Sequence, residues 1–248
     1  MGSESIERNP VERYGFLDAP ETRRLRGRRI VNALTAFGGI DICTARVLDV
    51  GCSAGLVAEE IAQRAFQVIG VDVDLAALAY AGRRGGIALY VGATAAHLPF
   101  RDGSFDAVVC NHVYEHVPDA RALLHELRRV LRPGGACYFA GGHTLQIIEP
   151  HFRLPLLSWL PRRWASAWVR RRGFAPRYDE AFVAPWQLRG LFEGFAAAEL
   201  ISPAMLRQPG RYGFPRLARL PRTLRVVVAA SSGLVARLAP TWIFMLRR

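Results

Sequence analysis

The chain has 248 residues and a formal net charge of +12, which arises from arginine alone because the sequence contains no lysine. Its length suits one α/β domain with insertions. Four scattered cysteines exclude a disulfide or zinc framework, the polar first residues are no signal peptide, and the apolar run 226–236 is too short to cross a bilayer. We therefore expect a cytoplasmic, single-domain protein.

Residues 1–40 are predicted to form a polar N-terminal segment followed by a helix that begins at Pro20. Glu21 near the helix start suits the helix dipole, and the pair Gly38-Gly39 ends the helix. The apolar face of this helix consists of Leu25, Ile30, Val31 and Leu34. Its arginines are most simply read as a solvated face.

The stretch 47–55 predicts a buried strand, a tight glycine loop and a helix start, because the apolar spacing becomes helical after it. Gly51 can adopt backbone angles closed to other residues, and Gly55 allows a ligand or a strand to come close. A dinucleotide-binding fingerprint would need glycine where Ser53 and Leu56 stand. We expect this junction to hold a nucleoside or an anion.

A second strand, 67–72, ends in Asp72, 21 residues after Gly51. An acid at this position is placed to accept both ribose hydroxyls of a nucleoside that rests on the first loop. Asp74 suits the N-cap of an apolar helix over 75–82. A third strand is predicted at 87–91.

Four motifs follow in a fixed order. They are Leu98-Pro99-Phe100, Gly103-Ser104-Phe105-Asp106, Glu115-His116-Val117 and Leu131-Arg132-Pro133-Gly134-Gly135, which precedes the expected fifth strand. Strands are predicted at 105–110 and 136–140, with an amphipathic helix to Leu131 between them. Together with Asp49-x-Gly51-x-x-x-Gly55, this order and spacing resembles the class I S-adenosylmethionine (SAM) dependent methyltransferases, and among them the ubiquinone and menaquinone methylating group (methyltransferase type 11).

Alternating strands and helices predict a doubly wound, seven-stranded and mostly parallel sheet, and the resemblance implies the Rossmann-like methyltransferase fold. Such sheets bind ligands at the carboxyl ends of their strands. Residues 41–150 are expected to form the SAM-binding core. The expected SAM-binding residues are Asp49, Gly51, Cys52, Ser53, Gly55, Asp72, Val73, Thr94 and Asn111.

Two positions depart from the family pattern. Ser53 replaces the middle glycine of the first loop, and Thr94 occupies the place of an acid that accepts the adenine amino group in similar enzymes. A hydroxyl can accept this hydrogen bond but adds no negative charge. Adenine recognition is therefore expected to depend more on backbone groups.

Candidate proton acceptors lie in the loops that border the expected methyl group. His143, Glu149 and His151 follow the fifth strand, and His116 lies on the preceding loop. Each of them also has a structural interpretation. The SAM sulfonium is already activated, so a base is needed only if the acceptor must lose a proton, and no metal site is predicted.

The excess positive charge lies in the C-terminal part. Residues 1–150 have 16 arginines against 17 acidic residues, whereas residues 151–248 have 17 arginines against four acidic residues. Two segments, 152–178 and 214–238, alternate arginine with apolar side chains. Residues 151–248 are therefore interpreted as the C-terminal part of the same domain, with basic, substrate-selecting insertions before a last strand at 242–246.

The leading functional hypothesis is in-line methyl transfer to a small-molecule, lipid-like or lipid-linked glycan acceptor, with the basic segments on the inner membrane face as a peripheral contact. The same segments can also be core-packing helices with solvated arginines. A nucleic-acid methyltransferase is disfavoured, because the residues after the fourth strand, Cys110-Asn111-His112-Val113, lack the Asn/Asp-Pro-Pro-aromatic motif of enzymes that methylate base amino groups. A SAM-binding protein without turnover is the remaining alternative. The oligomeric state is not predicted.

Overall fold

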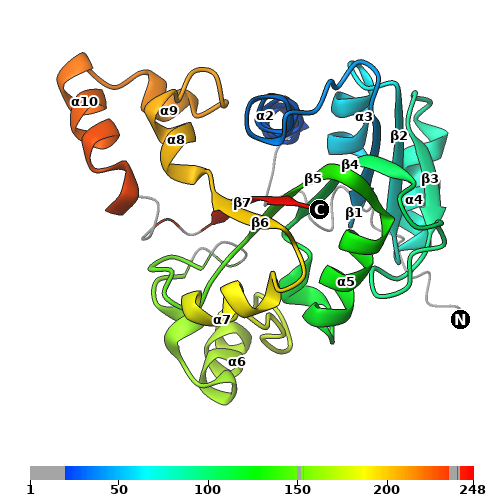
Figure 1. Ribbon diagram of the computed structural model, residues 1–248. Coiled ribbons are helices and arrows are strands. Elements are labelled where there is room, and N and C mark those ends of the chain that lie inside the picture. Colours follow the sequence, from blue (N-terminus) through cyan, green and yellow to red (C-terminus); the bar gives the residue numbers. More distant parts are fainter. Residues whose placement is uncertain (1–19, 150–151, 153, 235–238, 240) are drawn as a thin grey trace, which may run out of the picture.

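The computed structural model describes residues 20–149, 152, 154–234, 239 and 241–248 (Figure 1). The strands are β1 (Arg46–Val50), β2 (Gln67–Asp72), β3 (Leu89–Gly92), β4 (Phe105–Asn111), β5 (Leu131–Gly141), β6 (Ala197–Leu200) and β7 (Trp242–Arg247). They form one sheet in the order β3-β2-β1-β4-β5-β7-β6, parallel except for β7, which is antiparallel to both neighbours. The predicted seven-stranded, mostly parallel sheet is confirmed.

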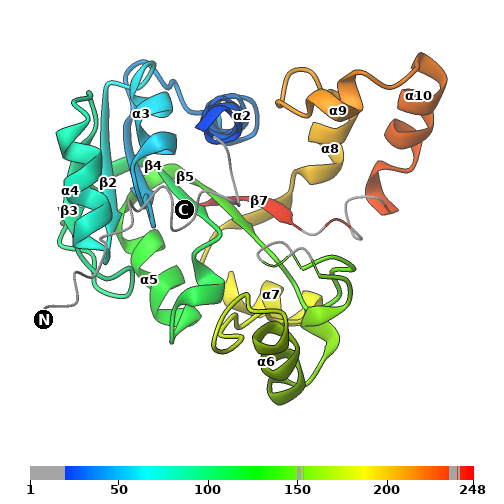
Figure 2. The ribbon, with the colours of Figure 1, turned by 180° about the vertical axis from the view of Figure 1, so that it is seen from behind.

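Helices cover both faces of this sheet (Figures 1 and 2). The helices are α2 (Pro20–Gly38), α3 (Leu56–Ala62), α4 (Leu75–Arg83), α5 (Ala120–Val130), α6 (Arg162–Arg171), α7 (Pro185–Leu191), α8 (Ser202–Arg207), α9 (Pro215–Ala218) and α10 (Arg222–Ala230). Within the described ranges, no helix is both long enough and apolar enough to span a bilayer.

Neighbouring residues of each strand enter opposite cores, as the two-residue repeat of a strand requires. Val47 of β1 packs with α2, α3 and α8 on one face of the sheet. Leu48 packs with α5 and α7 on the other face. The predicted helix over residues 20–38 therefore covers one face of the sheet, and its apolar stripe is buried there.

Three local predictions can be compared with the structure. Asp74 caps α4 as predicted, because its carboxylate accepts the amides of Ala76 and Ala77 at 3.0 Å. The third strand begins at Leu89, two residues later than the predicted start at Ile87. The amide of Ile87 donates to the carboxylate of Glu59 and not to a neighbouring strand.

The fifth strand, expected to begin at Ala136 after residues 132–135, begins earlier, at Leu131. These residues belong to β5, where the register with β4 shifts between Phe105 and Ala107. Gly134 adopts a φ of +76° at this irregularity. The motif is therefore a bulge inside a long strand, and the glycines allow the strand to bend there.

The order of the strands reverses between β1 and β4, so the loops that follow these two strands diverge and leave a crevice for ligands. The loop 51–55 follows β1, and the loop 112–119 follows β4. The predicted SAM-binding residues after β2 and β3 lie at the same edge of the sheet, because these strands are parallel to β1.

Two segments extend beyond the sheet and its covering helices. The segment 142–184 contains α6 and has its own small apolar core, formed by Leu154, Leu157, Ala165, Val169 and Tyr178. The segment 201–241 lies between β6 and β7 and contains α8, α9 and α10. In both views α6 and α10 project from the end of the molecule away from β3 and α4, on opposite sides of the sheet (Figures 1 and 2).

Candidate active site

The loop after β1 depends on its two glycines. Gly51 has a φ of +72°, and a methyl group added to it would lie 2.5 Å from a Cγ atom of Val113 in the β4 loop. Gly55 has a φ of +73°, and an added methyl group would overlap the hydroxyl of Tyr90. The two glycines therefore allow left-handed backbone and also close contact with neighbouring elements.

The middle position of this loop is held by Ser53, which has a φ of +49°. This left-handed conformation is uncommon for a residue with a side chain and explains why similar proteins have glycine here. The amide of Ser53 donates to Asp72 at 2.7 Å. Cys52 is buried against Gly70, and burial raises the pKa of its thiol, so only its backbone faces the loop.

Asp72 lies at the end of β2 with its carboxylate next to the loop. One oxygen accepts the amide of Ser53 and the other accepts the amide of Asp74, at 2.7 and 2.9 Å. Each carboxylate oxygen can accept a further hydrogen bond. The carboxylate is thus held in one orientation and keeps acceptor capacity for the two hydroxyls of a ribose.

Asp49 lies beneath the loop, 3% exposed. Its Oδ2 atom is buried and has no hydrogen-bond partner among the described residues. Burial, together with the charge of Asp72, raises the pKa of Asp49 to about 7, and Arg26 opposes both effects. A buried carboxylate with a free oxygen is suited to a cationic ligand group.

Apolar side chains are exposed on the other side of Asp72. Val73 and Leu75 are 69% and 68% exposed, and Leu75 lies against Gly92 at the end of β3. Thr94 is exposed two residues later, and its hydroxyl accepts the amide of Ala96 at 3.4 Å. These exposed groups make a partly apolar edge beside Asp72, which suits an adenine ring.

The loop after β4 contains a pair that the sequence analysis did not identify. Nδ1 of His112 lies 2.8 Å from Oε1 of Glu115, and Nε2 lies 3.2 Å from the hydroxyl of Thr241. Glu115 is fully buried, and its Oε2 atom has no hydrogen-bond partner in the described parts of the chain. Burial would raise the pKa of Glu115, but the hydrogen bond and charge of His112, with His116, lower it overall.

The position of this pair is fixed by its neighbours. His112 has a φ of +57°, which turns the chain sharply at the end of β4. The next residue, Val113, contacts Gly51, so His112 lies beside the loop that follows β1. Tyr114 packs its ring over Gly141 and donates to the carbonyl of Gly142 at 2.5 Å. The pair therefore lies between the ends of β1, β4 and β5.

The predicted proton acceptors have different surroundings. His116 is exposed on a short 3-10 turn, Tyr114–His116. His143 is buried and donates through Nε2 to the carbonyl of Ala239 at 2.9 Å, with its ring 4.4 Å from that of Trp242. Burial lowers the pKa of His143.

Glu149 is also buried, and its carboxylate accepts the amide of Phe152 at 2.6 Å. His151 lies outside the described residues. Asn111, predicted to contact the cofactor, is half-buried as the last residue of β4. The roles of these residues stay predictions, but the contacts of His143 and Glu149 also explain them as packing and loop-holding residues.

Comparisons with known proteins agree with this fold. The methyltransferase domain family matches residues 48–139. A ubiquinone biosynthesis O-methyltransferase of Ralstonia nicotianae is 32% identical over 157 residues, which cover 59% of this chain and 66% of that protein. A solved SAM-dependent methyltransferase of Mesorhizobium loti has a TM-score of 0.58 at 18% identity, over 90% of this chain and 100% of that one.

Residues 48–139 belong to the methyltransferase domain family of the class I SAM-dependent type. The matched domain supports SAM as the methyl donor. A geranyl diphosphate methyltransferase solved with SAM shares the fold, with a TM-score of 0.55 at 18% identity over 91% of this chain and 86% of that one. The chain spans between 42 and 66% of the length of the first curated relatives that it matches. The fold and family resemblance predicted from the motifs are confirmed.

The residues of this methyltransferase fit SAM on structural grounds. The free buried oxygen of Asp49 suits the ammonium group of the methionine part, the carboxylate of Asp72 suits the ribose, and the exposed edge at Val73 and Leu75 suits adenine. A cation, a diol and a flat ring are three of the features by which a protein can recognise SAM.

The first prediction concerns the close contact at Gly55. Gly55→Ala is expected to weaken SAM binding roughly 10- to 100-fold, because the left-handed backbone becomes strained and the ring of Tyr90 must move. Calorimetric titration with SAM measures this change. Ser53→Gly is the matched control, since glycine adopts the same loop conformation without strain and the amide still reaches Asp72; its affinity should be unchanged.

Proposed function

We propose that this protein transfers the methyl group of SAM to a hydroxyl oxygen of a small, lipid-like acceptor, with His112 as the general base. The observation that carries the proposal is the pair of His112 and buried Glu115 next to the loop at Gly51. A curated relative named as an O-methyltransferase of ubiquinone biosynthesis supports oxygen as the methylated atom. A lipid-linked glycan hydroxyl is an acceptor of the same chemistry.

The roles of the two residues follow from their contacts. Glu115 accepts Nδ1–H of His112, which fixes the ring and leaves Nε2 as the basic nitrogen. The hydroxyl of Thr241 occupies the Nε2 side, where an acceptor hydroxyl would donate its proton. Bound SAM supplies the electrophilic methyl group. The protein must then hold the acceptor oxygen in line with it, take the proton and exclude water.

The proposed SAM contacts follow the geometry of the loops. Asp49 would face the methionine ammonium, Asp72 the ribose, and Val73 with Thr94 the adenine. The backbone of Cys52 and Ser53 and the end of β4 at Asn111 complete the set. His116, His143, Glu149 and His151 remain as secondary candidates for the proton acceptor.

Apolar groups near the end of β5 support a lipid-like acceptor. Leu145, Ile147 and Ile148 are exposed on the segment that follows the strand, and Trp159 is exposed on the next turn. Clustered exposed apolar side chains mark a surface for an apolar ligand or a membrane. A membrane-derived acceptor would explain both these groups and the basic C-terminal part.

The second prediction tests the base. His112→Asn is expected to lower methyl transfer about 100-fold or more while SAM affinity stays within about threefold, because the ring acts on the acceptor and not on SAM. Transfer of labelled methyl from SAM to a bacterial lipid extract is the assay, and calorimetry gives SAM affinity. His125→Asn, an exposed histidine on α5, is the matched control.

The same assay separates the competing functions. Full methyl transfer by His112→Asn would exclude His112 as the base and return the role to His116 or His143. Label incorporated into nucleic acid and not into lipid would favour the nucleic-acid methyltransferase. SAM binding without transfer to any cellular fraction would favour a SAM-binding protein without turnover.

A further inference from the structure

The segment between β6 and β7 has an unusual charge. Residues 201–241 contain seven arginines and no aspartate or glutamate. Three helices, α8, α9 and α10, lie in this segment. Only its first part joins the sheet core, through Ile201, Met205 and Tyr212. Among the described residues, α9 and α10 have no buried side chain.

Helix α10 exposes apolar side chains. Leu224, Val226 and Val227 are 50%, 61% and 61% exposed, and Leu234 shortly after the helix is 62% exposed. Leu224 and Val227 are three residues apart and lie on the same side of α10, whereas Val226 lines the groove described below. Half or more of each of these side chains is left uncovered by the described residues, and exposed apolar side chains this close together mark a surface for a partner.

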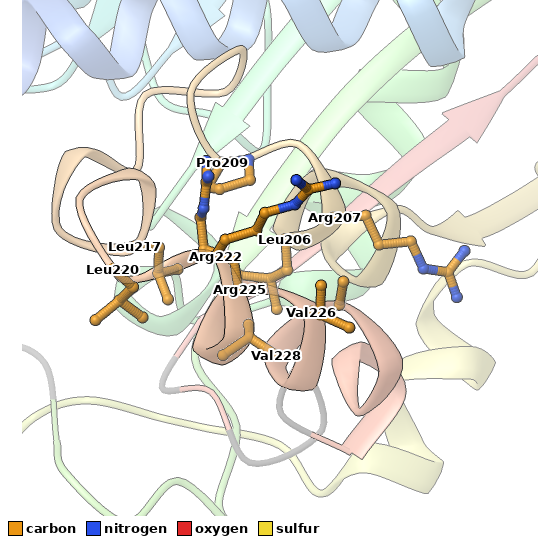
Figure 3. A pocket seen from close by; sticks show the side chains of 10 residues that line it. Leu206, Arg207, Pro209, Leu217, Leu220, Arg222, Arg225, Val226 and Val228 are labelled. Atoms are coloured by element: carbon orange, nitrogen blue, oxygen red, sulfur yellow. The ribbon is translucent and has the colours of Figure 1, made fainter.

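A groove of about 220 Å³ separates α10 from α8 and α9. Its walls are apolar, with Leu206, Leu217 and Val228 among them, and three arginines lie on it: Arg207, Arg222 and Arg225. Figure 3 shows the side chains of Arg222 and Arg225 extending to the side of the groove where Pro209 lies, away from Val228. Cationic groups thus flank apolar side chains on one surface.

The charge decides between possible partners. A second copy of this chain would bring two arginine-rich segments together without any acid to pair with, because 201–248 has no acidic residue. A nucleic acid would meet arginines, but also valine and leucine side chains that cannot bind phosphate or bases. An anionic bilayer satisfies both features, since its phosphates bind arginine and its interior takes apolar side chains.

We propose that α9 and α10 dock on an anionic lipid bilayer, with the exposed apolar side chains of α10 in the interfacial layer and Arg207, Arg222 and Arg225 at the lipid phosphates. This docking surface would bring the protein to the membrane that holds the lipid-like acceptor, and that role rests on the proposed function. It is tested independently, because binding to vesicles needs no turnover.

The segment 201–241 rejoins the sheet next to the proposed base, His112. Thr241, the last residue before β7, contacts His112 at 3.2 Å. The exposed Leu145, Ile147 and Ile148 follow β5, which is paired with β7. Docking through α10 therefore brings to the bilayer the end of the sheet at which the base lies.

The experiment is flotation of the full-length protein with vesicles of phosphatidylcholine containing 30% phosphatidylglycerol, compared with phosphatidylcholine alone. We expect the protein to float with the anionic vesicles at low salt and to be largely released at high salt. The double variant Val226→Glu, Val227→Glu should bind at least about tenfold more weakly. Arg222→Gln with Arg225→Gln should weaken binding about 30-fold on anionic vesicles, at about 1 kcal/mol for each arginine.

The matched control is Phe66→Glu with Ile87→Glu, which adds the same charge at two exposed apolar residues outside the segment. It should float like the unmodified protein. All variants should keep their SAM affinity, because the altered side chains are exposed and lie outside the SAM loops.

The proposal would be overturned if the α10 variant floated as well as the unmodified protein, or if the unmodified protein floated equally well with neutral and anionic vesicles. An oligomer that dissociates in the α10 variant would also overturn it. So would binding to single-stranded nucleic acid that is abolished by the two arginine changes. If vesicle binding is as expected but no lipid is methylated, the docking surface stands and the proposed acceptor is wrong.

Discussion

The Asp49→Asn protein is expected to be more stable than the unmodified protein without ligand at pH 8, and to bind SAM roughly 10- to 100-fold more weakly. The carboxylate is buried with one free oxygen, so its charge is costly until a cation reaches it. An amide of the same shape removes this cost and also removes the attraction for the ammonium group. Opposite effects on stability and affinity distinguish a ligand-binding group from a structural one.

The pH dependence follows from the raised pKa of Asp49, about 7 in the folded protein against 3.8 ordinarily. Between these values the folded protein binds a proton that the unfolded chain does not, so this group lowers stability as pH rises from about 4 to 7. The full cost, on the order of 4 kcal/mol, applies above pH 7. Asp49→Asn should therefore raise the Tm by about 5 °C or more at pH 8 and by little at pH 4.

SAM affinity should change with pH in the opposite sense. Below pH 7 Asp49 becomes protonated, so the unmodified protein should lose about tenfold in affinity between pH 8 and pH 6 relative to the asparagine variant. The comparison between the two proteins cancels titration of SAM itself. Parallel pH curves for the two proteins, or a less stable asparagine variant at pH 8, would contradict the assignment.

Asp72→Ala is expected to weaken SAM binding about 100-fold or more, since two charge-assisted hydrogen bonds to the ribose are lost. The amide of Ser53 also loses its acceptor, so the loop after β1 becomes less ordered. Calorimetric titration with SAM and with S-adenosylhomocysteine should show the same loss, because both ligands contain the ribose.

The neighbouring Asp74 provides the control for this change. Asp74→Ala removes the N-cap of α4 and should cost about 1 kcal/mol of stability, but SAM affinity should change less than threefold. Undiminished affinity in Asp72→Ala would sink the ribose assignment. Equal losses in both variants would show that the end of β2 is disturbed as a whole.

The sequence predicted those parts of the site that depend on local chain conformation. Gly51, Gly55 and Asp72 lie at the ends of short, strongly apolar strands, and their spacing alone placed them at one sheet edge. The cap at Asp74 followed from the same reasoning. The fifth strand was expected to begin only after residues 132–135, because paired glycines suit both a connection between elements and a bulge, and only the pairing with β4 distinguishes the two.

The pair of His112 and Glu115 could not be found in this way. Its geometry depends on a left-handed residue at the end of β4 and on partners that are distant in the sequence. The amide of Ala181 donates to the carbonyl of Glu115, and Thr241 reaches His112 from just before the last strand. The three-residue spacing is a signal, but without the fold it does not differ from any polar loop.

The segment 201–241 joins two strands that are already neighbours in the sheet. Leu200 at the end of β6 lies opposite Phe244 in β7, so a hairpin of a few residues would close this connection. The part with α9 and α10 is therefore topologically dispensable for the sheet, and it can be lengthened, exchanged or lost without changing the strands that hold SAM. The strands that hold SAM and the part of the chain that would contact a membrane are therefore structurally separable within one chain.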